Sequence, residues 1–173
     1  MKHYVGDRKH LQPLIDGLWC VNGGEPYAKI LSGSSTEENL GYLSKNAAKL
    51  FDLPAKSAIK IKRSYLLHMD NSGHFTGKGY GKYGHHDLRY LNIKEIIDIV
   101  KYIKNAEKSR IIIREKRGAF RYNILTRSVR NTIISVEKNK NHLTLVTAYN
   151  PDKRTLGKIR DELAKQKSHK GTL

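Results

Sequence analysis

Hydrophobic residues recur at helical spacing through much of the first 103 residues of the chain. This spacing predicts a short helix or irregular cap, a packing helix, an element of one or two turns and a long amphipathic helix, which in chain order cover 8–20, 36–51, 64–69 and 91–103. Two short runs have the composition of strands instead, and they cover 27–31 and 58–61. In the long helix one apolar stripe is formed by Ile93, Ile96, Ile97, Val100 and Ile103.

The pattern changes to short strand-like runs after residue 109. Four strand candidates follow one another, separated by charged or turn-like stretches, and they cover 110–115, 119–125, 131–138 and 142–149. Pro151 ends the last of them, and 151–167 has the spacing of a basic terminal helix. The order predicts an α+β fold with N-terminal helices, a four-stranded antiparallel sheet and a basic C-terminal helix.

Charge is distributed unevenly along the chain. Residues 1–55 carry six Lys or Arg and six Asp or Glu, whereas 56–173 carry 27 against 10 and so account for the whole net charge of +17. We interpret the LPAK segment as a boundary between a neutral helical part, which is a subdomain or an extension of the core, and a basic α+β module. A basic charge confined to one segment indicates a polyanionic partner, chiefly nucleic acid, with a membrane surface, an acidic protein or a merely solvated basic surface as alternatives.

Single residues and short motifs limit the setting of the protein. We expect Trp19 to be buried in the core and Cys20 to be a small buried residue. One cysteine permits no internal disulfide and is typical of a reducing compartment. No apolar run approaches the roughly 20 residues that span a bilayer, and the first residues lack the apolar core of a signal peptide. We therefore expect a cytoplasmic location, or delivery into the cytoplasm of a target cell.

Histidine and glycine are concentrated in residues 64–87. This segment holds four of the eight histidines and five of the fourteen glycines. Histidine titrates near neutral pH and suits proton transfer, so the grouping favours a reactive site, although each histidine alone is more often a surface or capping residue. The loop within the segment is suited to a phosphate backbone or is a solvated surface loop. Its candidate substrate-binding residues are Lys78, Lys82, His85 and His86.

Two other interpretations of this loop are weaker. Gly79, Gly81 and Gly84 satisfy the G-x-G-x-x-G pattern, but no long strand precedes them and no βαβ unit is present, which argues against a nucleotide-binding fold. A metal site is a further alternative, although its spacing fits no zinc pattern, and it would use His74, His85, His86 and Asp87. We expect neither a metal nor another cofactor.

The last strand candidate ends in hydroxyl-bearing residues. Alternation places Leu143, Leu145, Thr147 and Tyr149 on one face of the strand. Thr147 and Tyr149 would then project side by side about 7 Å apart. A face that begins apolar and ends with hydroxyl groups favours an end that leaves the core and enters a cleft, while the alternative is that Thr and Tyr are simply good strand formers.

The motifs of the chain follow in the order SYLLHM, a histidine-bearing loop, the apolar helix IKEIIDIV, several strands and then LVTAY. In this order of motifs the chain resembles the phage and polymorphic-toxin branch of the barnase–EndoU–colicin–RelE-like ribonucleases. Members of that branch typically have a histidine at the end of a short helix, often a second a few residues later, and a late strand ending in T-x-Y or S-x-Y. The corresponding positions in this chain are His68, then His74 (or His85 or His86), then Thr147 and Tyr149. The resemblance covers 58–150, and the insertion GHFTGKGYGKYGHH lengthens the usual spacing between the two histidines.

The resemblance implies an enzyme that cuts RNA without a metal ion, by attack of the ribose 2′-hydroxyl on the adjacent phosphate to give a 2′,3′-cyclic phosphate. His68 and His74 would then be base and acid, in either order, and Thr147 and Tyr149 would position the scissile phosphate. Arg114 or Arg121, on the predicted sheet, would supply positive charge. The need for a 2′-hydroxyl makes RNA the expected substrate.

The sequence therefore favours a small metal-independent endoribonuclease, and a toxin module that acts on tRNA or another structured RNA is one setting for it. The main rival is a non-catalytic RNA- or DNA-binding protein, and the third possibility is a metal-dependent nuclease. A toxin would have an antitoxin or immunity protein as partner, which we expect to be acidic because the site must be basic to hold RNA.

Overall fold

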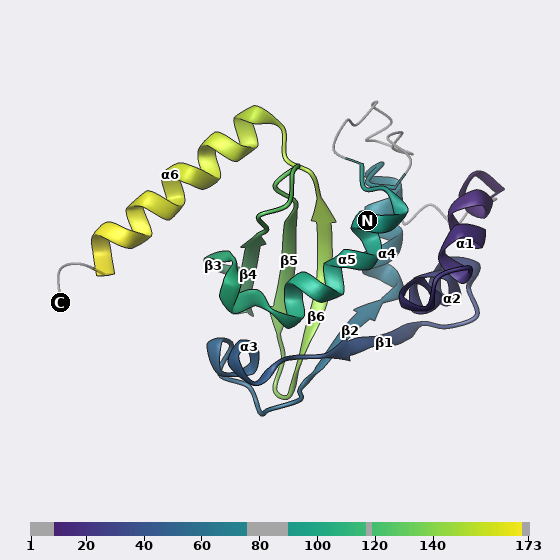
Figure 1. The fold of residues 1–173 in the computed structure, drawn as a ribbon, viewed down its shortest axis with the longest axis horizontal. Helices are drawn as coiled ribbons and strands as arrows, with labels where there is room; N and C mark the ends of the chain where they lie inside the picture. Colours follow the sequence, from purple (N-terminus) through teal and green to yellow (C-terminus); the bar gives the residue numbers. More distant parts are fainter. Residues whose placement is uncertain (1–8, 76–89, 117–118, 171–173) are drawn as a thin grey trace.

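The computed structural model describes residues 9–75, 90–116 and 119–170, with the side chains of 114–116 and 168–170 excepted. Six helices and six strands form within these ranges, together with short 3-10 turns, the first of which is η1 (Lys9–Leu11) (Figure 1). The helices are α1 (Gln12–Trp19), α2 (Glu25–Ser32), α3 (Lys45–Leu50), α4 (Arg63–Asn71), α5 (Ile93–Lys104) and α6 (Lys153–Lys170). The strands are β1 (Glu37–Tyr42), β2 (Ala58–Lys62), β3 (Arg110–Lys116), β4 (Ala119–Leu125), β5 (Ile133–Lys138) and β6 (His142–Tyr149).

One mixed sheet contains all six strands in the order β1-β2-β6-β5-β4-β3. The four strands predicted between 110 and 149 form and are antiparallel, which confirms that part of the expected fold. The sheet is larger than predicted because β2 pairs with β6 in parallel and β1 pairs with β2 in antiparallel fashion. The parallel pair is possible because the long segment from 63 to 141 connects β2 to β6.

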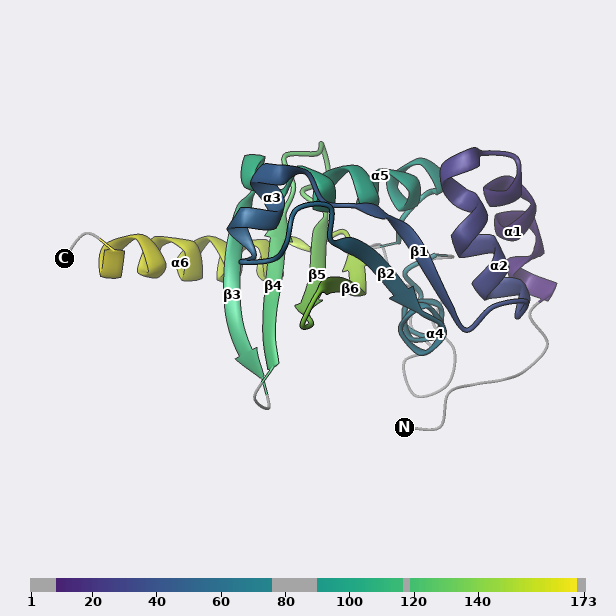
Figure 2. The ribbon, with the colours of Figure 1, turned by 90° about the horizontal axis from the view of Figure 1, so that it is seen from below.

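Neighbouring strand residues belong to different cores, as alternation requires. Ile134 lies in the main core with α5, whereas Ile133 lies in a small cluster with α6. Seen from below, α3 and α5 lie together along one side of the sheet, and α6 extends outward beyond β3 (Figure 2). The sheet residues in the main core are Ile59, Ile61, Ile124, Ile134, Val136, Leu143, Leu145 and Ala148.

The long helix α5 forms where the hydrophobic stripe predicted it, and its start is fixed by a capping box. Asn92 Oδ1 accepts the backbone N–H of Glu95 at 2.9 Å, and Glu95 Oε2 accepts the backbone N–H of Asn92 at 2.9 Å. The fully buried side chains are those of Ile96, Ile99 and Ile103, so the buried stripe is rotated slightly from the predicted one. The predicted elements at 8–20, 58–61, 64–69 and 151–167 form as α1, β2, α4 and α6.

Two N-terminal predictions were wrong. The predicted strand 27–31 is the middle of α2, which has Pro26 in its first turn and ends at Gly33 with a left-handed φ of 85°. The predicted helix 36–51 is instead β1 followed by α3, with Ser44 as the N-cap of α3. Pairing with β2 overrides the helical spacing here, because it satisfies the backbone of β1 across the sheet.

Trp19 and Cys20 were also predicted wrongly, since Trp19 is 45% exposed and Cys20 is exposed. α1 buries Ile15 and Leu18, which continue at helical spacing from the buried Leu11 of η1, and Trp19 falls beside that stripe. Residues from both sides of position 55 contribute to the main core. Within the described ranges, no helix has both the length and the apolar composition needed to cross a bilayer.

Candidate functional site at the end of β6

The helix α4 lies beside the C-terminal half of β6. β2 pairs with β6 as far as Ile61 opposite Leu145, and α4 then packs against the strand. His74 follows α4, and its backbone is fixed because its N–H donates to the carbonyl of Met69 and its carbonyl accepts the N–H of Leu91. The imidazole ring stacks on the ring of Tyr149, with ring centroids 5.4 Å apart and planes inclined by 19°. Two predicted site residues 75 positions apart are thus in contact.

A β-bulge in β6 sets the direction of the hydroxyl-bearing residues. The register between β5 and β6 shifts at Ser135/Val136, so that Leu145 pairs with Val136 and Thr147 with Ser135. The four residues expected on one face are therefore divided, with Leu143 and Leu145 in the main core and Thr147 and Tyr149 on the opposite face. The prediction of a shared face for all four was wrong, whereas Thr147 and Tyr149 do project together.

The hydroxyl of Thr147 is buried and has no hydrogen-bond partner within the described residues. Buried polar atoms are normally paired, so an orphan of this kind needs an explanation. The hydroxyl lies on the strand face that also carries Tyr149, two residue pairs closer to the middle of the strand. Its position is compatible with a group kept for a ligand.

Rows of polar side chains continue from Thr147 across the sheet. Thr147 pairs with Ser135 on β5, and Ser135 donates a hydrogen bond from its hydroxyl to Asn123 Oδ1 on β4 at 2.6 Å. The next row contains Thr144, Glu137 and Arg121. We call this surface the polar face; its residues are Thr144, Thr147, Tyr149, Ser135, Glu137, Arg121 and Asn123.

Arg121 is compensated by a carboxylate on the polar face. Its Nε lies 3.5 Å from Glu137 Oε2, and both side chains are partly buried. By strand geometry Arg121 lies roughly 10 Å across the sheet and about 7 Å along it from Thr147. Arg114 pairs with Arg121 through the backbone, but its side chain lies outside the described part of the structure.

A hydrogen-bonded network begins at Asn150, directly after Tyr149. The Asn150 amide donates to the carbonyl of Tyr90 at 3.0 Å and to Glu95 Oε2 at 3.2 Å, and its Oδ1 accepts the hydroxyl of Thr132 at 2.7 Å. Arg130 joins the same groups, with Nη2 donating to the Tyr90 carbonyl at 2.9 Å and Nη1 3.4 Å from Glu95 Oε2. The network fixes the end of β6 to the start of α5.

The ring of Tyr90 is the exposed aromatic group of this network. It is 40% exposed, and the guanidinium carbon of Arg130 lies 5.2 Å from its centroid. The Arg130 side chain is itself 35% exposed and lies against the ring as a cation–π contact. An arginine and an aromatic ring therefore meet solvent close to the His74–Tyr149 pair.

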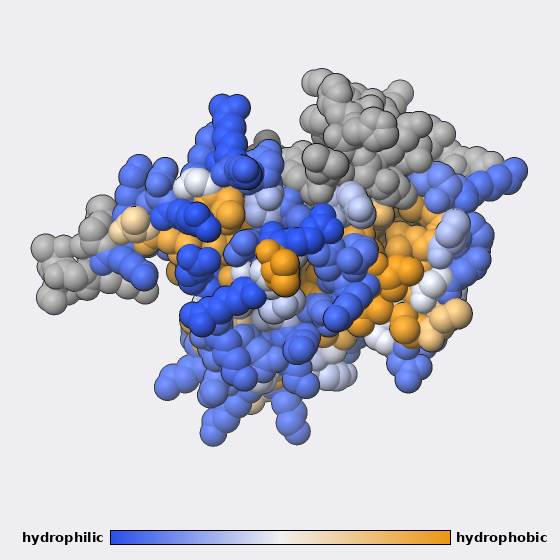
Figure 3. Space-filling view, turned by 45° about the horizontal axis from the view of Figure 1, so that its top comes forward, coloured by the Kyte–Doolittle hydropathy of each residue, from blue (hydrophilic) through white to orange (hydrophobic). Residues whose placement is uncertain are grey.

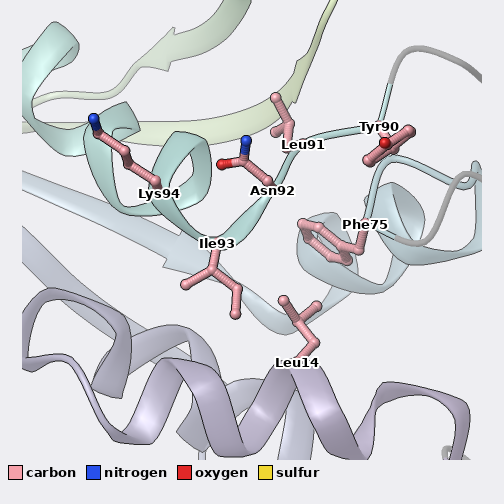
Figure 4. Close-up of a pocket in the computed structure, with 7 residues that line it drawn as sticks. All are labelled: Leu14, Phe75, Tyr90, Leu91, Asn92, Ile93 and Lys94. Atoms are coloured by element: carbon pink, nitrogen blue, oxygen red, sulfur yellow. The ribbon is translucent and has the colours of Figure 1, made fainter.

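A hollow of about 450 Å³ adjoins the network (Figure 4). Leu14 from α1, Phe75 from the segment after α4 and Ile93 from the start of α5 point toward one another there, while Lys94 points away. The N-terminal part of the chain also contacts α4, since His10 Nε2 lies 3.4 Å from Oδ1 of the buried Asp70. The neutral N-terminal residues thus border the candidate site.

The remaining predicted residues have other positions. His68 lies within α4, half-buried, because the helix continues to Asn71 and does not end at His68 as expected. Lys78, Lys82, His85 and His86 lie outside the described residues, as does Asp87 of the metal-site alternative. Within the described residues, no group of three or more His, Cys, Asp or Glu is arranged to hold a metal ion.

Sequence reasoning missed Arg130, Tyr90, Glu95 and Asn150. The N-x-x-E spacing of Asn92 and Glu95 is a readable capping signal, but it gives no hint that Glu95 also contacts Arg130 and Asn150 from distant parts of the chain. In comparisons with known proteins, neither a protein family, nor a curated protein, nor a solved structure matches this chain.

Proposed function

We propose that this protein is a metal-independent endoribonuclease that cleaves RNA by attack of a 2′-hydroxyl and leaves a 2′,3′-cyclic phosphate. The observation that carries the proposal is the ring stack of His74 on Tyr149. It joins a titratable group near neutral pH to a phenol at the end of a strand, beside the orphan hydroxyl of Thr147. The basic charge of 56–173 supplies the attraction for RNA.

The reaction needs a base near the 2′-hydroxyl, an acid near the leaving 5′-oxygen and donors around the developing phosphorane charge. His74 takes one proton-transfer role and His68 the other, in either order. Tyr149 and Thr147 hold the scissile phosphate through their hydroxyls. Arg121 and Arg130 are each paired with a carboxylate, that of Glu137 and that of Glu95 respectively. We assign the positive charge to Arg130 because its guanidinium lies against the exposed ring of Tyr90, in the network that begins directly after Tyr149.

Tyr90 suits the recognition of an unstacked base. RNA-binding proteins commonly stack bases on exposed aromatic side chains or on arginine guanidinium groups. The Tyr90 ring is exposed, and its carbonyl is fixed by Asn150 and Arg130, so the ring is held ready before a ligand binds. A base displaced from the stack beside the scissile phosphate is therefore the expected local substrate.

Incubation of the protein with total RNA in EDTA tests the proposal. We expect cleavage that produces 2′,3′-cyclic phosphate ends and spares DNA. His74→Gln and His68→Ala should each lower the rate about 10²- to 10⁴-fold, the usual contribution of a general acid or base. Tyr149→Phe preserves the ring stack and removes only the hydroxyl. A loss of cleavage in this variant would therefore come from the missing contact with the phosphate and not from altered packing.

His142→Gln is the matched control, because His142 lies on the same strand as Tyr149 but at its opposite end. Circular dichroism spectra of all variants show whether the fold is retained. Equal losses in the control and in a folded His74→Gln variant would contradict the assignment of His74. Cleavage that requires an added metal ion would favour the metal-dependent alternative, which uses the segment 74–87.

The second candidate function is non-catalytic binding of RNA or DNA. The burial of His74 favours it, since a side chain only 7% exposed presents little surface to a substrate. RNA that stays intact in EDTA but shifts on a native gel would support this function and reject the ribonuclease.

The biological setting proposed for the ribonuclease is a toxin that acts on tRNA or another structured RNA. Expression should then be toxic, and a cognate acidic antitoxin or immunity protein should relieve the toxicity by covering the basic site. Isolation of a neutral partner that binds only within 1–55 would count against this setting.

A further inference from the structure

The helix α6 is attached to the sheet by a narrow apolar face. Leu156, Ile159 and Leu163 pack on the cluster formed by Ile112, Leu125 and Ile133, and among the described side chains of α6 only Ile159 is fully buried. The helix extends past β3, away from the end of the molecule that holds α1 and α2 (Figure 1). In the space-filling view hydrophilic side chains project from it (Figure 3). Most of an 18-residue helix is thus available to a partner.

The sequence of α6 is strongly basic, with seven Lys or Arg against two acids. Three of the cations, Lys153, Arg160 and Lys167, are seven residues apart and therefore lie along one side of the helix, about 10.5 Å from each other. All three are exposed. Two small residues, Gly157 and Ala164, lie between them on the same side. We call these five residues the α6 stripe.

Gly157 is not required by the fold. A Cβ atom at this position would have nothing within 4 Å. Glycine weakens a helix interior relative to alanine, so its presence in the middle of α6 has a cost without a packing reason. Its benefit is close approach, since it lets another backbone come nearer to the helix than any side chain permits.

We infer that the α6 stripe binds the phosphate backbone of a double-helical segment of RNA. Exposed cations at regular spacing fit a regular row of phosphates, and the small residues between them let the groove edge lie against the helix. α6 contains no Phe, Tyr or Trp, the large rings on which single-stranded nucleic acids most often stack their bases. A straight helix of about 27 Å also matches a rigid duplex better than a flexible strand.

The choice of RNA rests on the proposed function, while the duplex contact rests on α6 alone. Together they describe a substrate in which a stem is held by the α6 stripe and a displaced base is held near Tyr90. This arrangement selects structured RNA, in which stems and unpaired nucleotides are adjacent.

Direct binding of a short 2′-O-methyl RNA duplex and of its isolated strand tests the inference. This probe has no free 2′-hydroxyl, so the result does not depend on whether the protein cleaves RNA. The stripe variant is Lys153→Gln/Arg160→Gln/Lys167→Gln. The matched control is Arg154→Gln/Lys158→Gln/Lys165→Gln, which removes the same charge from another side of the helix.

We expect the stripe variant to weaken duplex binding roughly 10- to 100-fold. The slope of log K against log salt concentration should also become shallower, by the amount that about two to three phosphate contacts contribute. Both effects should be much smaller in the control. Gly157→Leu should raise the thermal stability of the protein and still weaken duplex binding, because the added side chain blocks the approach. Equal losses in the stripe variant and the control, equal effects on duplex and single strand, or unchanged binding by Gly157→Leu would each overturn the inference.

Discussion

The two faces of the antiparallel strands are built from alternating residues of the same segments, yet they differ in chemistry. The face toward α5 carries aliphatic side chains such as Ile124, Ile134 and Leu145, all completely buried in the main core. The opposite face carries the hydroxyl, amide and ionic groups of the polar face, which bond to one another where they meet. The same side of the sheet also carries the small apolar cluster that α6 covers. Stability therefore depends mainly on one face, and the groups available for chemistry lie mainly on the other.

The bulge in β6 is what separates the two functions within a single strand. Before it, Leu143 and Leu145 point into the main core, and after it Thr147 and Tyr149 point to the polar face. Without the extra residue, the alternation would place Thr147 and Tyr149 in the core beside the leucines. A one-residue irregularity thus moves the proposed phosphate-binding groups out of the interior.

The largest effect is expected on the core face. Leu145→Ala removes a fully buried side chain and should lower the free energy of unfolding by about 2–5 kcal/mol, as measured by urea denaturation. The contrasting variant on the other face is Thr147→Val, which has the same shape and removes a buried hydroxyl without a partner in the described residues. It should change stability by less than about 1 kcal/mol and still lower RNA cleavage. A large destabilisation by Thr147→Val would show that the two faces are not separable.

An intermediate effect is expected where the polar groups are buried. Asn150→Ala removes three hydrogen bonds and leaves the Tyr90 carbonyl and the Glu95 carboxylate with fewer donors. We expect a loss of roughly 2–3 kcal/mol in the free energy of unfolding, because three hydrogen bonds of the buried Asn150 side chain are lost and their partly buried partners keep fewer bonds. Arg130→Ala, at the exposed edge of the same network, is the control and should cost less. Equal costs for both variants would contradict the central position assigned to Asn150.

The sequence predicted the parts of the fold that depend on local signals. The four antiparallel strands, α5 and α6 have regular spacing and clear ends, and all of them form. β1 could not be predicted, because its strand conformation depends on pairing with β2 some twenty residues later, against a helical pattern of its own. The same applies to the site: Arg130 meets Glu95 35 residues away, and Asn150 meets Tyr90 60 residues away. Only the resemblance placed His74 and Tyr149 in one site, since no spacing rule joins them.

The smallest effect is expected from the protonation of His142, which lies at the start of β6, away from Thr147 and Tyr149. Burial, with the nearby Lys60 and Lys62 cations, lowers the pKa of His142 from its ordinary value of 6.5, and Glu37 opposes this only in part. Below pH 6.5 the unfolded chain therefore takes up a proton at His142 more readily than the folded chain does. Stability should be unaffected by this group at higher pH and should fall as the pH decreases from 6.5 through the lowered pKa.

Urea denaturation of the wild type and of His142→Gln, between about pH 7.5 and 5, isolates this contribution from that of the other histidines. The stability of His142→Gln should decline less at low pH than that of the wild type. Lys60→Gln should reduce the decline by a smaller amount, because burial contributes more than Lys60 to the lowered pKa of His142. The effect should be small, since His142 is only partly buried and water screens its neighbours. A decline in stability as steep in His142→Gln as in the wild type would mean that this edge of the polar face accepts positive charge without cost. A basic phosphate-binding surface without bound RNA should instead resist a further positive charge.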